Sequence, residues 1–360
     1  MSVPVKRRLR LIATAVAVTL LLAGCGADHS ATSTATTVAS LGQLVSIGAG
    51  LSGPAGTTAT VYAQGPTKMS AFTQDSSGRL WIATADSTDS GQDGVYVVTA
   101  AGATATLVIA NLHTALGLVW IGDTLYVASK ELVEAYSGFD GTAFASHHTV
   151  LTLPSGVGES NNLAVSPDGR LLLGISSPSD NTAPTLAYSA SIVSFQRDGS
   201  DLQVYASGIR AAVGLTYYPR TSNLFVTMNQ RDDLADATPG DWLAQVRQGE
   251  NWKFPDCYGQ GGTVCDGVPS PVAVLDQHAA VSGVAILTGS LSSTSGPSAY
   301  VAEWANSAVK RVGLTDGAST TSSTAQTFIT GLKNPVPLLA TTTGTLLVGD
   351  WTTGTIYEIS

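Results

Sequence analysis

The densest group of residues that could do chemistry is an acidic segment in the second half of the chain. Residues 228–242 read Met-Asn-Gln-Arg-Asp-Asp-Leu-Ala-Asp-Ala-Thr-Pro-Gly-Asp-Trp and include Asp232, Asp233, Asp236 and Asp241. Carboxylates and backbone carbonyls are the oxygen ligands that calcium takes in proteins. The segment lacks the Gly and Glu spacing of an EF-hand loop, and an isolated acidic segment is more often a solvated loop. Its role therefore depends on the elements that hold it.

A short strand-like pattern recurs along the chain and defines those elements. Each copy is a turn followed by a run of mostly apolar residues, as in Gly78-Arg-Leu-Trp-Ile-Ala83. The copies begin at Gly78, Asp123, Gly169, Ser222, Ser298 and Gly344. Most steps between copies are roughly 45–53 residues, close to the length of a four-stranded propeller blade. The sequence therefore predicts an all-β fold, a six-bladed β-propeller with four-stranded antiparallel blades, over residues 46–360.

The two ends of the predicted ring carry complementary strand patterns. The chain ends in Gly354-Thr-Ile-Tyr-Glu-Ile-Ser360, and Ala59-Thr-Val-Tyr-Ala63 could supply the outer strand of the final blade. Such a closure removes the exposed edge of an open sheet. A sandwich of eight or more strands is the alternative, and the regular long spacing disfavours it. Propellers bind ligands on loops at one end of the axis, so the long acidic insertion is the predicted site.

The N-terminus has the order of features of an exported lipoprotein. Basic residues at 6–10 precede an apolar run over 11–23, which is shorter than the roughly 20 residues of a membrane-spanning helix. The run ends in Leu22-Ala23-Gly24-Cys25, which resembles the bacterial lipoprotein cleavage box. We expect residues 1–24 to be a signal peptide, Cys25 to be lipidated and 25–45 to form a flexible tether. The protein would then be extracytoplasmic and anchored to the bacterial cell membrane.

The other two cysteines predict a disulfide, and the composition disfavours a nucleic-acid-binding protein and a helix bundle. Cys257 and Cys265 flank a Gly-rich loop, and outside the cytoplasm such a pair is more often a disulfide than a metal site. The formal net charge is −9, so a nucleic-acid partner is not expected. Charged residues make up only 12% of the chain, which disfavours a helix bundle.

Several segments around the acidic insertion resemble the glucose/sorbosone dehydrogenase family. They are Gly208-Ile-Arg-Ala-Ala-Val-Gly-Leu215, Asn229-Gln-Arg-Asp-Asp233, Pro239-Gly-Asp241 and Glu250-Asn-Trp-Lys-Phe-Pro-Asp-Cys-Tyr-Gly259. The resemblance is clearest from about Leu163 to Val312. It implies a six-bladed propeller that uses pyrroloquinoline quinone (PQQ) and calcium to oxidise a sugar hydroxyl or aldehyde.

The resemblance also implies roles for individual residues. Arg210 matches the family arginine beside the quinone carbonyls, where it would stabilise negative charge as the quinone is reduced. Asp241 matches an acidic position near the cofactor, and Gln230 and Arg231 match the turn whose backbone carbonyls hold calcium. Lys310 reads as part of an inner or next-to-inner strand, where it would pair with a cofactor carboxylate or be a solvated strand residue.

The chain departs from the family pattern at the catalytic base. The family His lies before the Pro-Asp-Gly turn of the third blade, where this chain reads Gly156-Val-Gly-Glu-Ser-Asn-Asn162. Glu159 is the nearest titratable group, and it would serve as a base only if burial raised its proton affinity. His147 and His148 come too early in the chain, on an expected outer strand. Basic residues that could pair with the three carboxylates of PQQ are few.

Three functions are compatible with these patterns. The first is a PQQ-dependent sugar dehydrogenase, with Glu159 and Arg210 as its catalytic residues. The second is a non-catalytic propeller that binds a glycan or another ligand and has lost the catalytic His. The third is a metal-dependent hydrolase, whose ligands the sequence does not supply. His278 has no spaced partner and favours a structural role. Trp304 and Trp351 are interpreted as packing between blades, with stacking on a sugar ring as the less favoured alternative.

Overall fold

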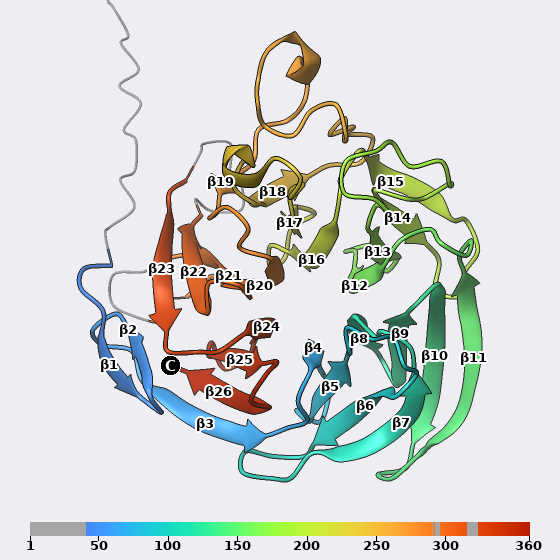
Figure 1. The fold of residues 1–360 in the computed structure, drawn as a ribbon. Helices are drawn as coiled ribbons and strands as arrows, with labels where there is room; N and C mark the ends of the chain where they lie inside the picture. The colour runs from blue at the N-terminus through green and yellow to red at the C-terminus, as the bar shows by residue number, and fades with distance from the viewer. Residues whose placement is uncertain (1–40, 290, 292–295, 315–322) are drawn as a thin grey trace, which may run out of the picture. The chain divides into compact units, whose positions relative to one another are not determined.

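The strands form six sheets arranged in a ring around a central axis (Figure 1). The structure is a computed structural model that describes residues 41–289, 291, 296–314 and 323–360. Each sheet contains a blade of four antiparallel strands, so the predicted six-bladed β-propeller is confirmed. The predicted signal peptide, Cys25 and the tether up to residue 40 lie outside the described residues. None of the described residues belongs to a helix long and apolar enough to cross a membrane.

The blades follow one another in chain order, and each is built from its innermost strand at the axis outward. Blade one comprises β4 (Met69–Gln74), β5 (Leu80–Thr84), β6 (Asp93–Val98) and β7 (Thr106–Leu112), and blade two β8 (Gly117–Ile121), β9 (Thr124–Ser129), β10 (Leu132–Phe139) and β11 (Phe144–Thr152). Blade three comprises β12 (Ser160–Val165), β13 (Leu171–Ile175), β14 (Ser191–Phe195) and β15 (Gln203–Ser207), and blade four β16 (Ala212–Tyr217), β17 (Leu224–Met228), β18 (Trp242–Val246) and β19 (Ala273–Val274). Blade five comprises β20 (Val281–Leu287), β21 (Ser298–Glu303), β22 (Ala308–Gly313) and β23 (Ala325–Thr330), and blade six β24 (Pro335–Ala340), β25 (Leu346–Asp350), β26 (Thr355–Ile359) and β3 (Ala59–Gln64).

The recurring sequence pattern corresponds to the second strand of each blade. Every residue of β5, β13, β17 and β25 is buried, because the neighbouring blades cover both faces of these strands. The outermost strands are more exposed, and β11, which carries His147 and His148, is exposed over most of its length. Six hydrophobic clusters of described residues lie between adjacent blades. The core is therefore distributed around the ring, and it holds the axial ends of the strands in fixed positions.

The ring closes through a strand from the beginning of the chain. β3 pairs antiparallel with β26, and the two lie side by side in Figure 1. Beyond the strands, the amide of Thr58 donates to the carbonyl of Ser360 at 2.7 Å, and the amide of Ser360 donates to the carbonyl of Thr58 at 3.0 Å. The predicted closure by residues 59–63 is confirmed.

A hairpin that the sequence did not predict extends blade five. It consists of β1 (Val45–Gly48) and β2 (Leu51–Gly53), and Ser52 pairs with Thr330 of β23. Ile47 and Leu51 pack into the cluster between blades five and six. The hairpin covers the outer edge of β23, which would otherwise present unpaired backbone groups.

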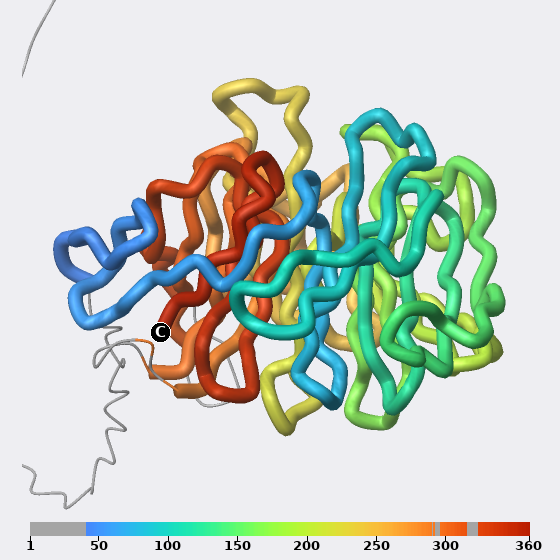
Figure 2. Tube along the Cα trace, turned by 90° about the horizontal axis from the view of Figure 1, so that it is seen from below, coloured from blue at the N-terminus to red at the C-terminus, as the bar shows by residue number. Residues whose placement is uncertain are grey.

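Antiparallel strands place successive connections on opposite faces of the ring. The turns between first and second strands share one face, and the predicted turn at Ser166–Gly169 is among them. The amide of Gly169 donates to the carbonyl of Ser166 at 2.8 Å, with Gly169 at a positive φ of 86°. Loops between second and third strands lie on the other face, where the loop from β17 to β18 (yellow) stands out in Figure 2. The acidic segment occupies this long loop.

Candidate functional site

A cavity of about 1380 Å³ lies at the axis of the ring, on the face that carries the acidic segment. We call it the axial cavity. Its lining combines residues at or beside the start of each innermost strand with residues from the loops that follow the second strands. The first kind is represented in blades one to six by Ser70, Leu116, Ser160, Val213, Ser282 and Val336. Because all six blades contribute, closure of the ring creates the cavity.

Local irregularities in the innermost strands open the wall of the axial cavity. The ladder between first and second strands shifts register early in β4, β12, β16, β20 and β24. Ser70, Val213 and Ser282 lie within these shifts and line the cavity. A bulge turns a residue out of the regular pairing, which is a common device beside binding sites. The backbone thus presents both hydroxyl and apolar groups to the axis.

Four of the predicted site residues line the axial cavity: Glu159, Arg210, Gln230 and Asp241. They come from two blades, since Glu159 directly precedes β12 and the other three lie beside β16, β17 and β18. The structure thus brings together residues that are separated by about 80 positions in the chain. The roles that the resemblance implies for them remain predictions.

Lys310 lies outside the axial cavity, and the prediction of its strand position was wrong. It is on β22, the third strand outward, and not on an inner or next-to-inner strand. Its ammonium lies 2.8 Å from a carboxylate oxygen of Asp276 and 3.6 Å from one of Glu303, and it donates to the hydroxyl of Thr327 at 3.1 Å. Lys310 does not line the axial cavity. These contacts bind it to its own blade and the loop before it.

Arg210 is held by a loop of the neighbouring blade. Its guanidinium donates to Asp180 at 2.6 Å (Nη2–Oδ1) and 3.2 Å (Nε–O), and to the carbonyl of Asn229 at 3.2 Å. The carboxylate of Asp180 also accepts the amides of Asp232 at 3.0 Å and Asp233 at 2.9 Å. Asp180 therefore joins Arg210 to the acidic segment and compensates the positive charge of the arginine.

Asp241 is the buried carboxyl group of the site. It is 3% exposed and accepts the amide of Gln230 at 2.8 Å and the amide of Val281 at 3.2 Å. Burial raises the pKa of Asp241 to about 6, although both backbone hydrogen bonds oppose this change. Glu159, in contrast, is exposed and lacks the burial expected of a carboxylate base. Asp241 is therefore a buried group of the site that can exchange a proton near neutral pH.

His278 lines the axial cavity, which the sequence did not indicate. Its Nδ1 is 2.8 Å from a carboxylate oxygen of Asp232, and its Nε2 is 3.1 Å from the carbonyl of Ala235. Because both ring nitrogens face oxygen acceptors, the protonated ring is favoured, and the pKa of His278 is raised chiefly by Asp232. The partner sits 46 positions earlier in the chain, so no local spacing could have revealed it.

Trp304 and Trp351 both combine packing with exposure to the axial cavity. Their ring centroids lie 6.2 Å apart in an edge-to-face arrangement, and the indole of Trp351 donates to the carbonyl of Ala85 at 3.1 Å. Trp304 is 38% exposed. The interpretation of packing between blades holds, and the two indoles also form an apolar wall of the cavity.

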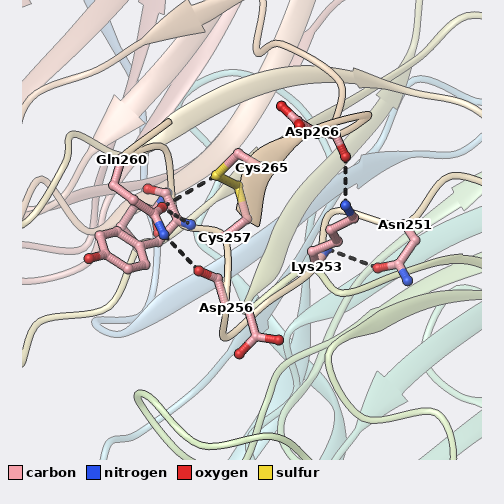
Figure 3. Close-up of a disulfide and its surroundings, with 9 residues drawn as sticks. Asn251, Lys253, Asp256, Cys257, Gln260, Cys265 and Asp266 are labelled. Carbon is pink, nitrogen blue, oxygen red and sulfur yellow. Dashed lines mark hydrogen bonds between the residues drawn. A yellow bond between two sulfur atoms is a disulfide. The ribbon is translucent and has the colours of Figure 1, made fainter. Parts of the chain in front are cut away.

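The predicted disulfide between Cys257 and Cys265 is present (Figure 3). Its loop supports the acidic segment. The side-chain amide of Gln230 donates to the carbonyl of Tyr258 at 2.9 Å, and the guanidinium of Arg231 lies 4.8 Å from the Tyr258 ring centroid. The guanidinium of Arg231 also pairs with Asp233, and Arg231 does not line the axial cavity. The disulfide loop thus fixes the turn at residues 230–231 from outside the cavity.

The charges around the axial cavity are mostly negative. The carboxylates that line it are Asp86, Asp89, Glu131, Glu159, Asp180, Asp232 and Asp241. The basic side chains in the lining are Lys130, Arg210 and His278. Each of these three already pairs with a carboxylate of the same lining, namely Asp89, Asp180 and Asp232.

Several solved structures with a similar fold are sugar dehydrogenases or other carbohydrate-active enzymes. The holo form of the PQQ domain of pyranose dehydrogenase from Coprinopsis cinerea aligns with a TM-score of 0.70 at 16% identity, over 86% of this chain and 97% of that chain. A calcium structure of a Trichoderma reesei carbohydrate-active enzyme of family AA12 gives 0.70 at 19%, over 86% and 96%. The PQQ-bound aldose sugar dehydrogenase from Streptomyces coelicolor gives 0.62 at 20%, over 86% and 99%. The chain shares the fold of these enzymes.

The fold therefore agrees with the family that the sequence resembles. No protein-family model and no curated protein matches the chain. At identities of 13–20% the structural similarity establishes the architecture, and chemistry has to be argued from the site itself.

The residues of the axial cavity do not fit PQQ well. A quinone with three carboxylates needs cationic partners, but every basic side chain in the lining is already paired with an acid. The described residues also contain no group of three or more His, Cys, Asp or Glu side chains placed to hold a metal ion. Calcium would thus depend on backbone carbonyls such as those predicted at Gln230 and Arg231.

Proposed function

We propose that the protein is a sugar-binding propeller whose ligand occupies the axial cavity. The observation that carries the proposal is the combination of many carboxylates with the Trp304–Trp351 pair around one cavity of about 1380 Å³. Carboxylates accept hydrogen bonds from sugar hydroxyls, and an indole face covers the apolar face of a sugar ring. The cavity volume exceeds what a single small-molecule ligand requires, so the site is large enough for a sugar with part of a glycan chain.

The cellular setting that we propose follows from the N-terminal sequence. A signal peptide over 1–24 and lipidation of Cys25 would place the propeller outside the cytoplasm, anchored to the cell membrane. Expression in a bacterium fed a labelled fatty acid tests this step. We expect label and membrane association in the wild type, and neither in Cys25→Ser. An unlabelled wild-type protein would exclude the lipid anchor.

Oxidation of the bound sugar is the second candidate function. It is favoured by the fold shared with PQQ-dependent sugar dehydrogenases, and by the presence of Asp241 as a buried carboxyl with a pKa of about 6. A base with a pKa near the working pH is suited to proton abstraction from a sugar hydroxyl. The paired basic residues of the cavity oppose this candidate, because they leave the charge of PQQ uncompensated.

A thermal-shift titration distinguishes the two candidates, because a ligand that binds the folded state raises its melting temperature. The protein without residues 1–24 is titrated with a panel of mono- and oligosaccharides, and separately with PQQ and calcium. Sugar binding predicts a saturable rise with at least one sugar and none with PQQ. A saturable rise in melting temperature with PQQ, together with reduction of a dye when sugar is added, would favour sugar oxidation over sugar binding as the function. No rise with any sugar would remove the proposal.

A further inference from the structure

The axial cavity contains carboxylates that form no ion pair with a basic side chain of the described residues. Asp241 accepts the backbone amides of Gln230 and Val281, and Glu131 accepts the amide of Gly156 at 2.6 Å. Within the described residues, neither of these groups nor Glu159 has an ion-pair partner. A ligand that brings a positive charge would therefore meet several uncompensated negative charges in a partly enclosed site, where electrostatic attraction is stronger than in water.

Two further polar atoms at the same cavity have no hydrogen-bond partner among the described residues. Ser160 lines the cavity, is 1% exposed, and its hydroxyl makes no hydrogen bond with the described residues. Asn229 also lines the cavity, and its side-chain carbonyl oxygen is buried without a partner there. Buried polar groups are nearly always satisfied in native proteins. Both oxygens can accept N–H bonds, so a ligand with an ammonium group would satisfy them.

The arrangement suits an organic cation better than a metal ion. The carboxylates are spread around a cavity of about 1380 Å³, and they form no compact group of metal-ligating side chains within the described part of the chain. An ammonium group needs only a few acceptors for its three donors, and the more distant carboxylates still attract its positive charge. The two indoles of Trp304 and Trp351 attract both cations and sugar rings.

We infer that the ligand of the axial cavity is an amino sugar with a free ammonium group. This inference rests on the proposed sugar binding and specifies its substrate class. The ammonium lies beside Glu159 and Ser160, which are adjacent in the chain, and the negative charge of Asp241 in the same lining adds to the attraction; the sugar ring lies toward the indoles. An N-acetylated sugar carries no charge at this position and is bound less tightly.

Calorimetric titration with four probes at pH 7 tests the inference: glucosamine, glucose, N-acetylglucosamine and butylamine. We expect glucosamine to bind about tenfold more tightly than the two neutral sugars, an advantage that falls in high salt. Equal affinity for glucose and glucosamine would overturn the inference and leave sugar binding intact. Butylamine binding as tightly as glucosamine would overturn the amino sugar and the sugar proposal together. Binding of none of the four would overturn the inference, and the panel of mono- and oligosaccharides would then decide the proposed sugar binding separately.

Three variants of the chain make the test specific. Glu159→Gln, at an exposed position, removes one charge and should reduce the preference for glucosamine over glucose to about threefold. Ser160→Ala should weaken glucosamine binding without lowering the melting temperature, because the deleted hydroxyl has no partner in the part of the chain that the structure describes. Asp123→Asn is the control, since Asp123 is exposed and does not line the cavity. An unchanged preference in both test variants would also overturn the inference.

Discussion

Asp93 in blade one and Asp241 in blade four occupy equivalent places and make equivalent hydrogen bonds. Each lies at the start of the third strand and is 3% exposed. Asp93 accepts the amides of Asp86 at 2.9 Å and Thr114 at 3.0 Å. Asp241 accepts the amide of Gln230 from its own blade and that of Val281 from the next. In both blades the carboxylate connects the loop of its own blade to the beginning of the next blade.

The two regions differ in what surrounds this shared connection. Asp241 lines the axial cavity, whereas Asp93 does not. Lys68 and Lys130 neutralise the acids beside Asp93, which are Asp86 and Asp89. Beside Asp241, Arg210 is already paired with Asp180. In blade one the buried carboxylate of Asp93 only connects adjacent blades. In blade four the buried carboxylate of Asp241 connects adjacent blades and also lines the axial cavity.

Deleting the two carboxylates gives the largest expected effect and tests the comparison directly. Asp241→Ala leaves the two buried hydrogen bonds from the amides of Gln230 and Val281 without an acceptor and should lower the free energy of unfolding by about 4 kcal/mol. Asp93→Ala should cost only about 2 kcal/mol, because its hydrogen bonds from Asp86 and Thr114 are only partly buried and water can reach the freed amides. Urea denaturation measures both values. A larger loss for Asp93→Ala would mean that water does not reach the amides freed in blade one.

The pH dependence of stability should also separate the two regions. Folding raises the pKa of Asp241 from about 4 to about 6, so the folded state binds a proton that the unfolded chain has released. The free energy of unfolding should therefore fall as pH rises from about 4 to about 6, by up to roughly 3 kcal/mol. Asp232 adds to this rise in pKa and Arg210 opposes it.

Asp241→Asn isolates this contribution, because it removes the titration while keeping one acceptor. Urea denaturation between pH 4 and 7 should show a flatter profile for the variant than for the wild type. Asp123→Asn, at an exposed position, is the control, whereas Asp93→Asn should also flatten the profile because burial raises the pKa of Asp93 as well. Identical profiles for the wild type and Asp241→Asn would show that Asp241 titrates alike in the folded and unfolded states.

The disulfide loop is a third difference between the two blades. Blade one connects β6 to β7 by a short turn, whereas blade four carries the loop closed by Cys257 and Cys265 between β18 and β19. Replacing both cysteines by serine should lower the free energy of unfolding by about 2 kcal/mol. Because this loop holds Gln230 and Arg231, sugar affinity should fall as well. A loss of stability at full affinity would show that the turn holds its position without the loop.

The smallest expected effect concerns the indole wall. Trp304→Ala should weaken sugar binding by about 1 kcal/mol, because the exposed indole face is lost. Trp351→Ala should also reduce stability, since its indole donates to the carbonyl of Ala85 in blade one. Calorimetric titration beside thermal unfolding separates the two effects. If Trp304→Ala keeps the full sugar affinity, the Trp304 indole contributes to packing and not to sugar binding.

Features that depend on local pattern could be predicted from the sequence. The six second strands, the closure by residues 59–63, the turn at 166–169 and the disulfide each follow from alternation, turn residues or cysteine spacing. The site was predictable only in part. Arg210, Gln230 and Asp241 were found through the resemblance, but the pairing of Arg210 with Asp180 and of His278 with Asp232 joins distant loops.

The hairpin β1–β2 and the position of Lys310 were missed for the same physical reason. Two short strands of 4 and 3 residues carry too little pattern to be recognised. Lys310 is buried on a third strand because Asp276 and Glu303 compensate its charge, and both partners lie outside its own strand. Tertiary contacts, which no local pattern encodes, decided both outcomes.

We infer that the axial cavity carries an uncompensated negative charge and therefore favours a positively charged ligand. Calorimetric titration of the protein without residues 1–24, with glucosamine in one experiment and PQQ plus calcium in the other, tests it most directly. We expect saturable binding of glucosamine and no heat of binding with PQQ. Saturable binding of PQQ that is lost in Arg210→Ala, with no binding of glucosamine, would contradict the claim.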